Sequence, residues 1–144
     1  MIQIPITRFD ADLELPKQIR GGDAAADFPT AVDVSLEPGQ RSTVPTGFGV
    51  ALPPGWCGLI LPRSGLAHKH GITVVNAPGL IDSGYRGEIK VILLNTSAES
   101  VFLERGQRIA QFALSAVPDW TFEEVDELPA DTDSRGALGF GSSG

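Results

Sequence analysis

The sequence predicts an all-β domain, an antiparallel sandwich or barrel built from many short strands. Apolar residues alternate with polar ones in several short segments, and turn-forming Gly and Pro separate these segments at intervals of roughly 8–12 residues. A long amphipathic helix with capping residues is missing from the pattern. The 144 residues fit one domain with a single hydrophobic core.

The strand segments follow one another along the chain. In one of them Val32, Val34 and Leu36 alternate with Asp33 and Ser35. The segment 109–117 fits a helix or a strand, and its alternation favours a strand. One or two helical turns are expected over residues 64–70. We expect strands at residues 2–6, 32–36, 48–52, 57–61, 72–75, 88–94, 101–103 and 109–117.

Composition excludes several classes of protein. Cys57 is the only cysteine, so a disulfide within the chain and a cysteine-based zinc site are excluded. No apolar run reaches the roughly 18–20 residues that span a bilayer, and the N-terminus lacks a signal-peptide pattern. We therefore expect a cytoplasmic protein with no membrane partner.

The net charge of −7 comes from one segment. Residues 117–133 hold seven of the 18 acidic residues and no Lys or Arg, while the other 11 acids balance the 11 bases. Without a basic stripe, a nucleic-acid partner is not expected. A small anionic ligand remains compatible, because a few Arg side chains and backbone N–H groups suffice to bind it.

The chain divides into a β domain at residues 1–127 and a C-terminal arm at 128–144. The arm is rich in Asp, Ser and Gly, and it has too few apolar residues to offset its ordering entropy, so we expect it to be mobile. Arg135 and Phe140 stand out in it as a cation and an aromatic ring suited to a ligand. An inert frayed tail is the equally weighted alternative.

Two segments carry groups suited to chemistry. Arg63, Ser64 and Gly65 form an anion-binding site if a helical turn that Ser64 caps begins there; the alternative is an ordinary capped turn. Residues 76–88 are expected to form a hairpin in which Asp82 activates a water, or serves only as a turn residue. Gln111, among apolar neighbours, requires a backbone or ligand partner.

Several familiar sites are excluded or disfavoured. The chain has no phosphate-binding Gly-x-x-x-x-Gly-Lys-Ser/Thr loop, and no helix can follow the glycines of 136–141 as a dinucleotide fold requires. A triad of Ser64, His68 and Asp82 lacks the nucleophile elbow. His68 and His70 flank a lysine, which makes a poor metal site.

Taken together in order and spacing, five segments resemble the motifs of the trimeric dUTPase family across nearly the whole chain. The first segment departs most, with Ala25 where the family usually has Gly and Phe28 where it often has Leu. The five segments are residues 22–28, 62–67, 76–88, 105–111 and 135–144.

The resemblance implies a jelly-roll-like β barrel and a homotrimer with shared active sites, in which the C-terminal arm reaches onto a neighbouring subunit. It implies the hydrolysis of dUTP to dUMP and pyrophosphate with Mg²⁺, which limits uracil incorporation into DNA and supplies dUMP for thymidylate synthesis. The family's water-activating residue matches Asp82, and Asp27 matches an outer-shell metal partner that acts through water.

Substrate-binding roles follow by the same resemblance. Phosphate oxygens would contact Arg63, Ser64, Gly65 and Gln111. Asn76 and the backbone of Leu80 and Ile81 would recognise the uracil edge, and Tyr85 would exclude a ribose 2′-hydroxyl. Lys90 matches a substrate-binding position. Arg135 would cover the γ-phosphate as a catalytic residue, and Phe140 would stack on the base.

Two alternative functions are compatible with parts of the sequence. A dCTP deaminase shares parts of the second to fourth motifs, but it needs a Glu where this chain has Ile92, and it usually has Phe or Trp where Tyr85 stands. A non-catalytic binding protein of the same fold would be expected to lack Asp82, Arg63 or Phe140, and all three are present. The sequence therefore favours a dUTP hydrolase.

Overall fold

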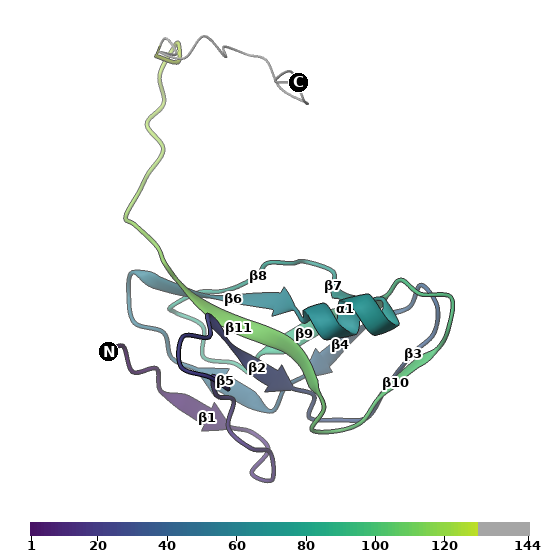
Figure 1. Ribbon diagram of the computed structural model, residues 1–144. Helices are drawn as coiled ribbons and strands as arrows, with labels where there is room; N and C mark the ends of the chain where they lie inside the picture. The colour runs from purple at the N-terminus through teal and green to yellow at the C-terminus, as the bar shows by residue number, and fades with distance from the viewer. Residues whose placement is uncertain (130–144) are drawn as a thin grey trace.

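The computed structural model describes residues 1–129, which form an all-β domain with one short helix (Figure 1). In chain order the elements are β1 (Ile6–Arg8), β2 (Ala25–Pro29), β3 (Val34–Leu36), β4 (Arg41–Pro45), β5 (Phe48–Val50), β6 (Trp56–Pro62), α1 (Ser64–His70), β7 (Ile72–Val74), β8 (Gly79–Ile81), β9 (Lys90–Asn95), β10 (Val101–Leu103) and β11 (Arg108–Ala116).

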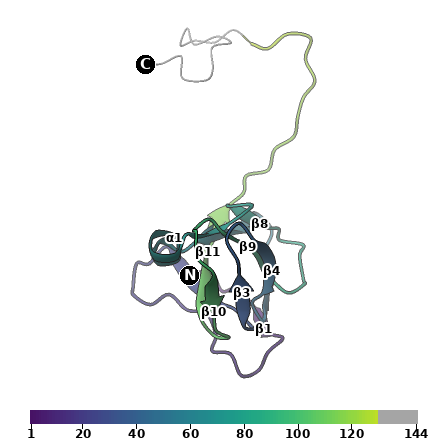
Figure 2. The same cartoon turned by 90° about the vertical axis from the view of Figure 1, so that its right-hand side faces the viewer.

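The strands pair only in the antiparallel sense within the described part of the chain. A four-stranded sheet has the order β2-β11-β6-β8, a three-stranded sheet has the order β4-β9-β7, and β1-β5 and β10-β3 form two-stranded ribbons. Figure 2 shows these groups arranged around one interior. This arrangement confirms the all-β, jelly-roll-like prediction, although no hydrogen-bond ladder closes the barrel over residues 1–129.

The core lies between the four-stranded and three-stranded sheets. Phe28 of β2 packs against Phe112 of β11 and Phe48 of β5, with ring centroids 5.6 and 5.9 Å away. These rings and the surrounding aliphatic side chains are buried, among them Leu36, Ile72, Ile89, Leu93 and Ile109. Their burial supplies the main stabilisation of a domain of this size, and it fixes the sheet edges that carry the polar residues described below.

Most of the expected strands are present. The segment 101–103 is a strand, and β11 confirms the choice of strand over helix for 109–117. The expectation for residues 2–5 is wrong, because β1 begins only at Ile6, which pairs with Val50. Pro5 explains the difference, since it has no N–H to donate to a ladder; its carbonyl accepts the N–H of Ala51 instead, at 2.9 Å.

The helix forms over the expected residues, but its N-terminal capping residue is not the one expected. Its N-cap residue is Arg63, which makes no side-chain capping bond, and Ser64 is already helical, so the expectation that Ser64 caps the turn is wrong. Leu66 anchors the helix in the core. Gly71 ends it in the left-handed conformation at φ 64°, and its N–H donates to the carbonyl of Ala67.

Residues 76–88 do not fold into a self-paired hairpin. Instead β7 and β9 pair with each other, and the segment between them contributes β8 to the opposite sheet, where Ile81 pairs with Gly58 of β6. The chain after β8 turns away and hydrogen-bonds to the corner between β4 and β5, where Ile89 donates to Phe48. This corner therefore takes the place of the second hairpin strand.

Beyond β11 the chain leaves the body of the domain (Figures 1 and 2). Residues 117–129 form no helix or strand, and Trp120 and Phe122 are exposed and stack edge to face on each other at 4.9 Å. Between residues 1 and 129 no helix has the length and apolar character needed to cross a membrane.

Candidate active site

A charged cluster forms at one end of the four-stranded sheet. Arg63, directly after β6, binds Asp27 of β2 with two parallel hydrogen bonds, from Nε at 2.9 Å and from Nη2 at 3.1 Å. Arg108 at the start of β11 adds a third bond to Asp27, from Nη1 at 3.1 Å. Two cations thus share one carboxylate, which leaves one net positive charge at a partly exposed edge.

Strand order explains why these residues meet. Strand β11 lies between β2 and β6, so Gln111 pairs with Asp27 on one side and with Leu61 on the other. The side-chain amide of Gln111 donates to the carbonyl of Pro62 at 2.7 Å, which is the partner that its apolar surroundings required. Ser64 and Gly65 are exposed beside this cluster, at the start of α1.

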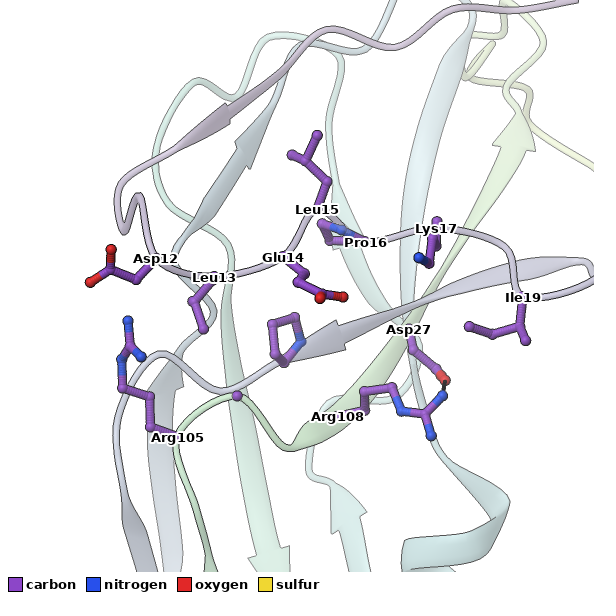
Figure 3. A pocket seen from close by; sticks show the side chains of 12 residues that line it. Asp12, Leu13, Glu14, Leu15, Pro16, Lys17, Ile19, Asp27, Arg105 and Arg108 are labelled. Atoms are coloured by element: carbon purple, nitrogen blue, oxygen red, sulfur yellow. Dashed lines mark hydrogen bonds and ion pairs between the residues drawn. The ribbon is translucent and has the colours of Figure 1, made fainter.

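Two cavities adjoin the cluster. The one in Figure 3 has a volume of about 420 Å³ and lies between Asp27, Arg108 and the segment 12–19. A second, of about 290 Å³, is lined by Asp27 and Gln111. At the far end of the first cavity, the hydrogen bonds from Arg105 hold the pKa of Asp10 below its usual value.

A separate cavity of about 210 Å³ collects the residues assigned to the base, the sugar and the attacking water. Its lining includes an exposed carboxylate and an aromatic ring from one turn, and a lysine at the start of β9. The cavity is lined by Leu80, Ile81, Asp82, Tyr85, Glu88, Ile89 and Lys90. Five of these were predicted from the sequence, and the two others, Glu88 and Ile89, were not.

Asp82 and Tyr85 are held in one tight turn. The N–H of Tyr85 donates to the carbonyl of Asp82 at 3.1 Å, and Arg86 donates to the carbonyl of Ser83 at 2.6 Å. The turn is therefore closed through backbone carbonyls, which leaves the Asp82 carboxylate exposed at the cavity. Asn76 lies outside the cavity lining, with its amide against the backbone of Gly79.

The charged cluster and the cavity are at opposite ends of the same sheet. Ile81 pairs with Gly58, so Asp82 lies beyond the Cys57 end of β6, while Arg63 follows its other end at Pro62. At about 3.3 Å per residue, the six positions between 57 and 63 separate the two sites by roughly 20 Å. The Arg63 side chain points further away, toward Asp27 on β2.

The family model for dUTPase matches residues 11–144. The chain belongs to the dUTPase family. It is 56% identical over 144 residues to a deoxyuridine 5′-triphosphate nucleotidohydrolase of Thermobifida fusca, covering 99% of this chain and 79% of that protein. The enzyme of the same name from Rhodococcus erythropolis is 49% identical, with 99% and 87% covered.

Solved structures agree on the fold. The dUTPase of Staphylococcus bacteriophage 80alpha with dUPNHPP superposes on this dUTPase-family chain with a TM-score of 0.91 at 25% identity. The superposition covers 100% of this chain and 99% of the phage protein.

Sequence reasoning missed two residues near this dUTPase-family site. Arg108 lies in the fourth motif, at the start of β11. Because β11 pairs directly with β2, which carries Asp27, this arginine was a usable signal once the two strands were paired. Glu88 looked like the first residue of a strand, although β9 begins only at Lys90. Arg135 and Phe140 lie outside the described residues, as does most of the expected arm at 128–144.

Proposed function

We propose that this chain hydrolyses dUTP to dUMP and pyrophosphate by attack of water on the α-phosphorus. The observation that carries the proposal is the cavity that gathers Leu80, Ile81, Asp82, Tyr85 and Lys90 in a member of the dUTPase family. In this proposal, one nucleotide bound in the cavity contacts the residues assigned to the base and the sugar, and it lies near the exposed carboxylate of Asp82. The same assignment makes the protein a cytoplasmic enzyme of nucleotide metabolism.

Asp82 is the proposed general base. Its exposed carboxylate accepts a proton from the attacking water, which turns the water into a stronger nucleophile toward the α-phosphorus. The backbone of Leu80 and Ile81 and the side chain of Asn76 recognise the uracil edge. Tyr85 packs against the deoxyribose where a 2′-hydroxyl would otherwise fit, and Lys90 adds a positive charge at the cavity rim.

The charged cluster binds the triphosphate. Arg63 presents a planar fork that matches phosphate oxygens, Gln111 and the hydroxyl of Ser64 add hydrogen bonds, and Gly65 has an accessible backbone N–H with open space around its Cα. Arg135 covers the γ-phosphate and Phe140 stacks on the base, from positions beyond the described residues. Arg108 compensates Asp27 when Arg63 turns toward phosphate.

Mg²⁺ fits as an ion that the triphosphate brings. No group of three potential metal ligands occurs within residues 1–129, so an all-protein site is not formed there. Asp27 uses three of the about four acceptor positions of a carboxylate for arginine bonds, and one remains for a metal-bound water. When bound, Mg²⁺ neutralises charge on the phosphates.

We also propose that the active site is shared between subunits of a homotrimer. Asp82 and Arg63 are separated by roughly 20 Å along β6, at about 3.3 Å per residue, so one chain does not bring both to the same α-phosphate. A second copy that presents its charged cluster to this cavity completes the site. The exposed Trp120 and Phe122 beyond β11 supply apolar surface for contact between the copies.

Deamination of dCTP is disfavoured by β9. The strand has the sequence KVILLN, so its only charged side chain is that of Lys90, and Ile92 occupies the position where a deaminase requires a proton-shuttling Glu. A side-by-side assay of pyrophosphate release from dUTP, UTP, dTTP and dCTP, with and without Mg²⁺, tests the proposal. We expect fast pyrophosphate release only from dUTP, and only when Mg²⁺ is present. Release of ammonia from dCTP at a comparable rate would overturn the assignment.

A further inference from the structure

The segment that carries Tyr85 is fixed to the rest of the domain at the corner between β4 and β5. The N–H of Ile89 donates to the carbonyl of Phe48 at 2.8 Å, and the carbonyl of Ile89 accepts from Thr46, from its N–H at 3.2 Å and from its hydroxyl at 2.7 Å. Thr46 and Ile89 are both fully buried. The backbone of residue 89 is therefore held on both sides.

One side chain from the Tyr85 segment joins this contact. Oε1 of Glu88 accepts the N–H of Gly47 at 2.8 Å, across 41 positions in sequence. Gly47 has φ 79°, a conformation that L side chains rarely adopt. Glu88 is half-buried, and this bond engages one oxygen of its carboxylate with the corner.

Tyr85 is in turn positioned by residues 87 and 88. Its hydroxyl donates to the backbone carbonyl of Glu88 at 2.8 Å. Its ring lies so close over Gly87 that a Cβ there would be 2.5 Å from Oη and 2.7 Å from Cζ. The orientation of the ring therefore depends on where the Glu88 backbone lies, and that depends on the bonds from Gly47 and Thr46.

We propose that Glu88 and Thr46 are positioning residues for sugar selection: by fixing the backbone that orients Tyr85, they set the preference of the site for deoxyribose over ribose. The inference rests on the proposed function, because it needs Tyr85 to face the sugar. Rejection of one added hydroxyl is sensitive to small displacements of the wall that excludes it. Loss of the contacts at the corner between β4 and β5 should therefore change kcat/KM for UTP and for dUTP by different factors.

The test measures kcat/KM for dUTP and for UTP in the full chain and in Glu88→Ala and Glu88→Gln. Glutamine keeps a carbonyl that can accept from Gly47, so it is the matched control. We expect Glu88→Ala to lower the dUTP/UTP ratio about tenfold, equivalent to about 1.4 kcal/mol, and Glu88→Gln to stay within about twofold of the unaltered protein. An unchanged ratio in Glu88→Ala would overturn the inference.

A double-variant comparison separates positioning from a direct role. In a Tyr85→Ala background there is no ring to position, so adding Glu88→Ala should change the ratio by less than about twofold. An undiminished effect in that background would mean that Glu88 acts without Tyr85, against the inference. If the unaltered protein releases no pyrophosphate from dUTP, the proposed function itself fails. If dUTP turnover is normal but the dUTP/UTP ratio does not respond to Glu88→Ala, only the inference about Glu88 fails.

A second pair of variants covers the case in which Glu88→Ala does not fold. Thr46→Val removes the hydroxyl that donates to Ile89 while keeping the shape of the side chain, and Thr46→Ser keeps the hydroxyl. Each folded variant is identified by its thermal melting curve. We expect the dUTP/UTP ratio of kcat/KM to fall in Thr46→Val and to stay near that of the unaltered protein in Thr46→Ser. Equal ratios in the two variants would contradict the proposal.

Discussion

The charged cluster and the nucleotide cavity are built in different ways. In the cluster, charged side chains mainly satisfy one another. Arg63 and Arg108 both bind Asp27, and within residues 1–129 no backbone N–H donates to its carboxylate, while Arg63 also donates to the carbonyl of Arg108 at 3.1 Å. In the cavity, the turn at residues 82–86 and the segment after it are held mainly through backbone carbonyls and N–H groups.

On the proposed function, this difference indicates how the cluster and the cavity each bind their part of dUTP. On the proposed function, a triphosphate that approaches the cluster would compete with Asp27 for Arg63, so binding there would involve an exchange of ion partners. A uridine that enters the cavity meets walls that are already in place, so recognition there depends on shape. Substitutions in the two regions should therefore produce different kinetic signatures.

The largest effect is expected for Asp82→Asn. Asparagine keeps the size of the side chain and removes its ability to take a proton, so kcat should fall by about 10²–10⁴-fold. Binding of dUTP, measured by calorimetry on the same variant, should remain within a few-fold because the cavity walls are unchanged. Retained turnover would show that another group activates the water.

Arg63→Lys should have the next largest effect. Lysine keeps the charge and loses the planar fork, and hydrogen bonds to charged groups contribute about 1.5–3 kcal/mol, so kcat/KM should fall about 10–100-fold. The matched control is Arg41→Lys, on an exposed position of β4 away from the cluster. Comparable losses in both variants would argue against a specific role for the cluster.

Deletion of residues 134–144 tests the C-terminal motif. Losing Arg135 and the stacking ring of Phe140, where stacking contributes about 1–3 kcal/mol, should reduce turnover by about tenfold or more. The melting temperature should move little, because the buried core of the described residues lies between Leu13 and Phe112. A loss of stability that matches the loss of turnover would make this segment structural.

The sequence predicted the fold class and the membership of the cavity well. Alternating residues identified β6 and β11, and an aliphatic run identified β10. The third motif and Lys90 just beyond it supplied the five predicted residues among the seven that line the cavity. Local patterns succeeded there because those residues are neighbours in the chain. They failed at residues 2–5 and 76–88, where Pro5 and the β4–β5 corner determine which backbone groups pair.

Long-range contacts were beyond the reach of sequence patterns. The bond from the Gly47 N–H to Glu88 and the ion pairs of Asp27 depend on strand order, which a single sequence does not specify. The same holds for the separation of Asp82 from Arg63, which follows from the register of β6 with β8. These three features determine how the proposed site works.

In the proposed homotrimer, each active site takes Asp82 from one subunit and Arg63 from another. Mixing inactive Asp82→Asn and Arg63→Ala chains by co-refolding tests it directly. Random assembly should place an unaltered Asp82 opposite an unaltered Arg63 in about a quarter of the sites, so the mixture should recover about that share of the original activity. A mixed oligomer as inactive as either variant alone would mean that each site is formed by a single chain.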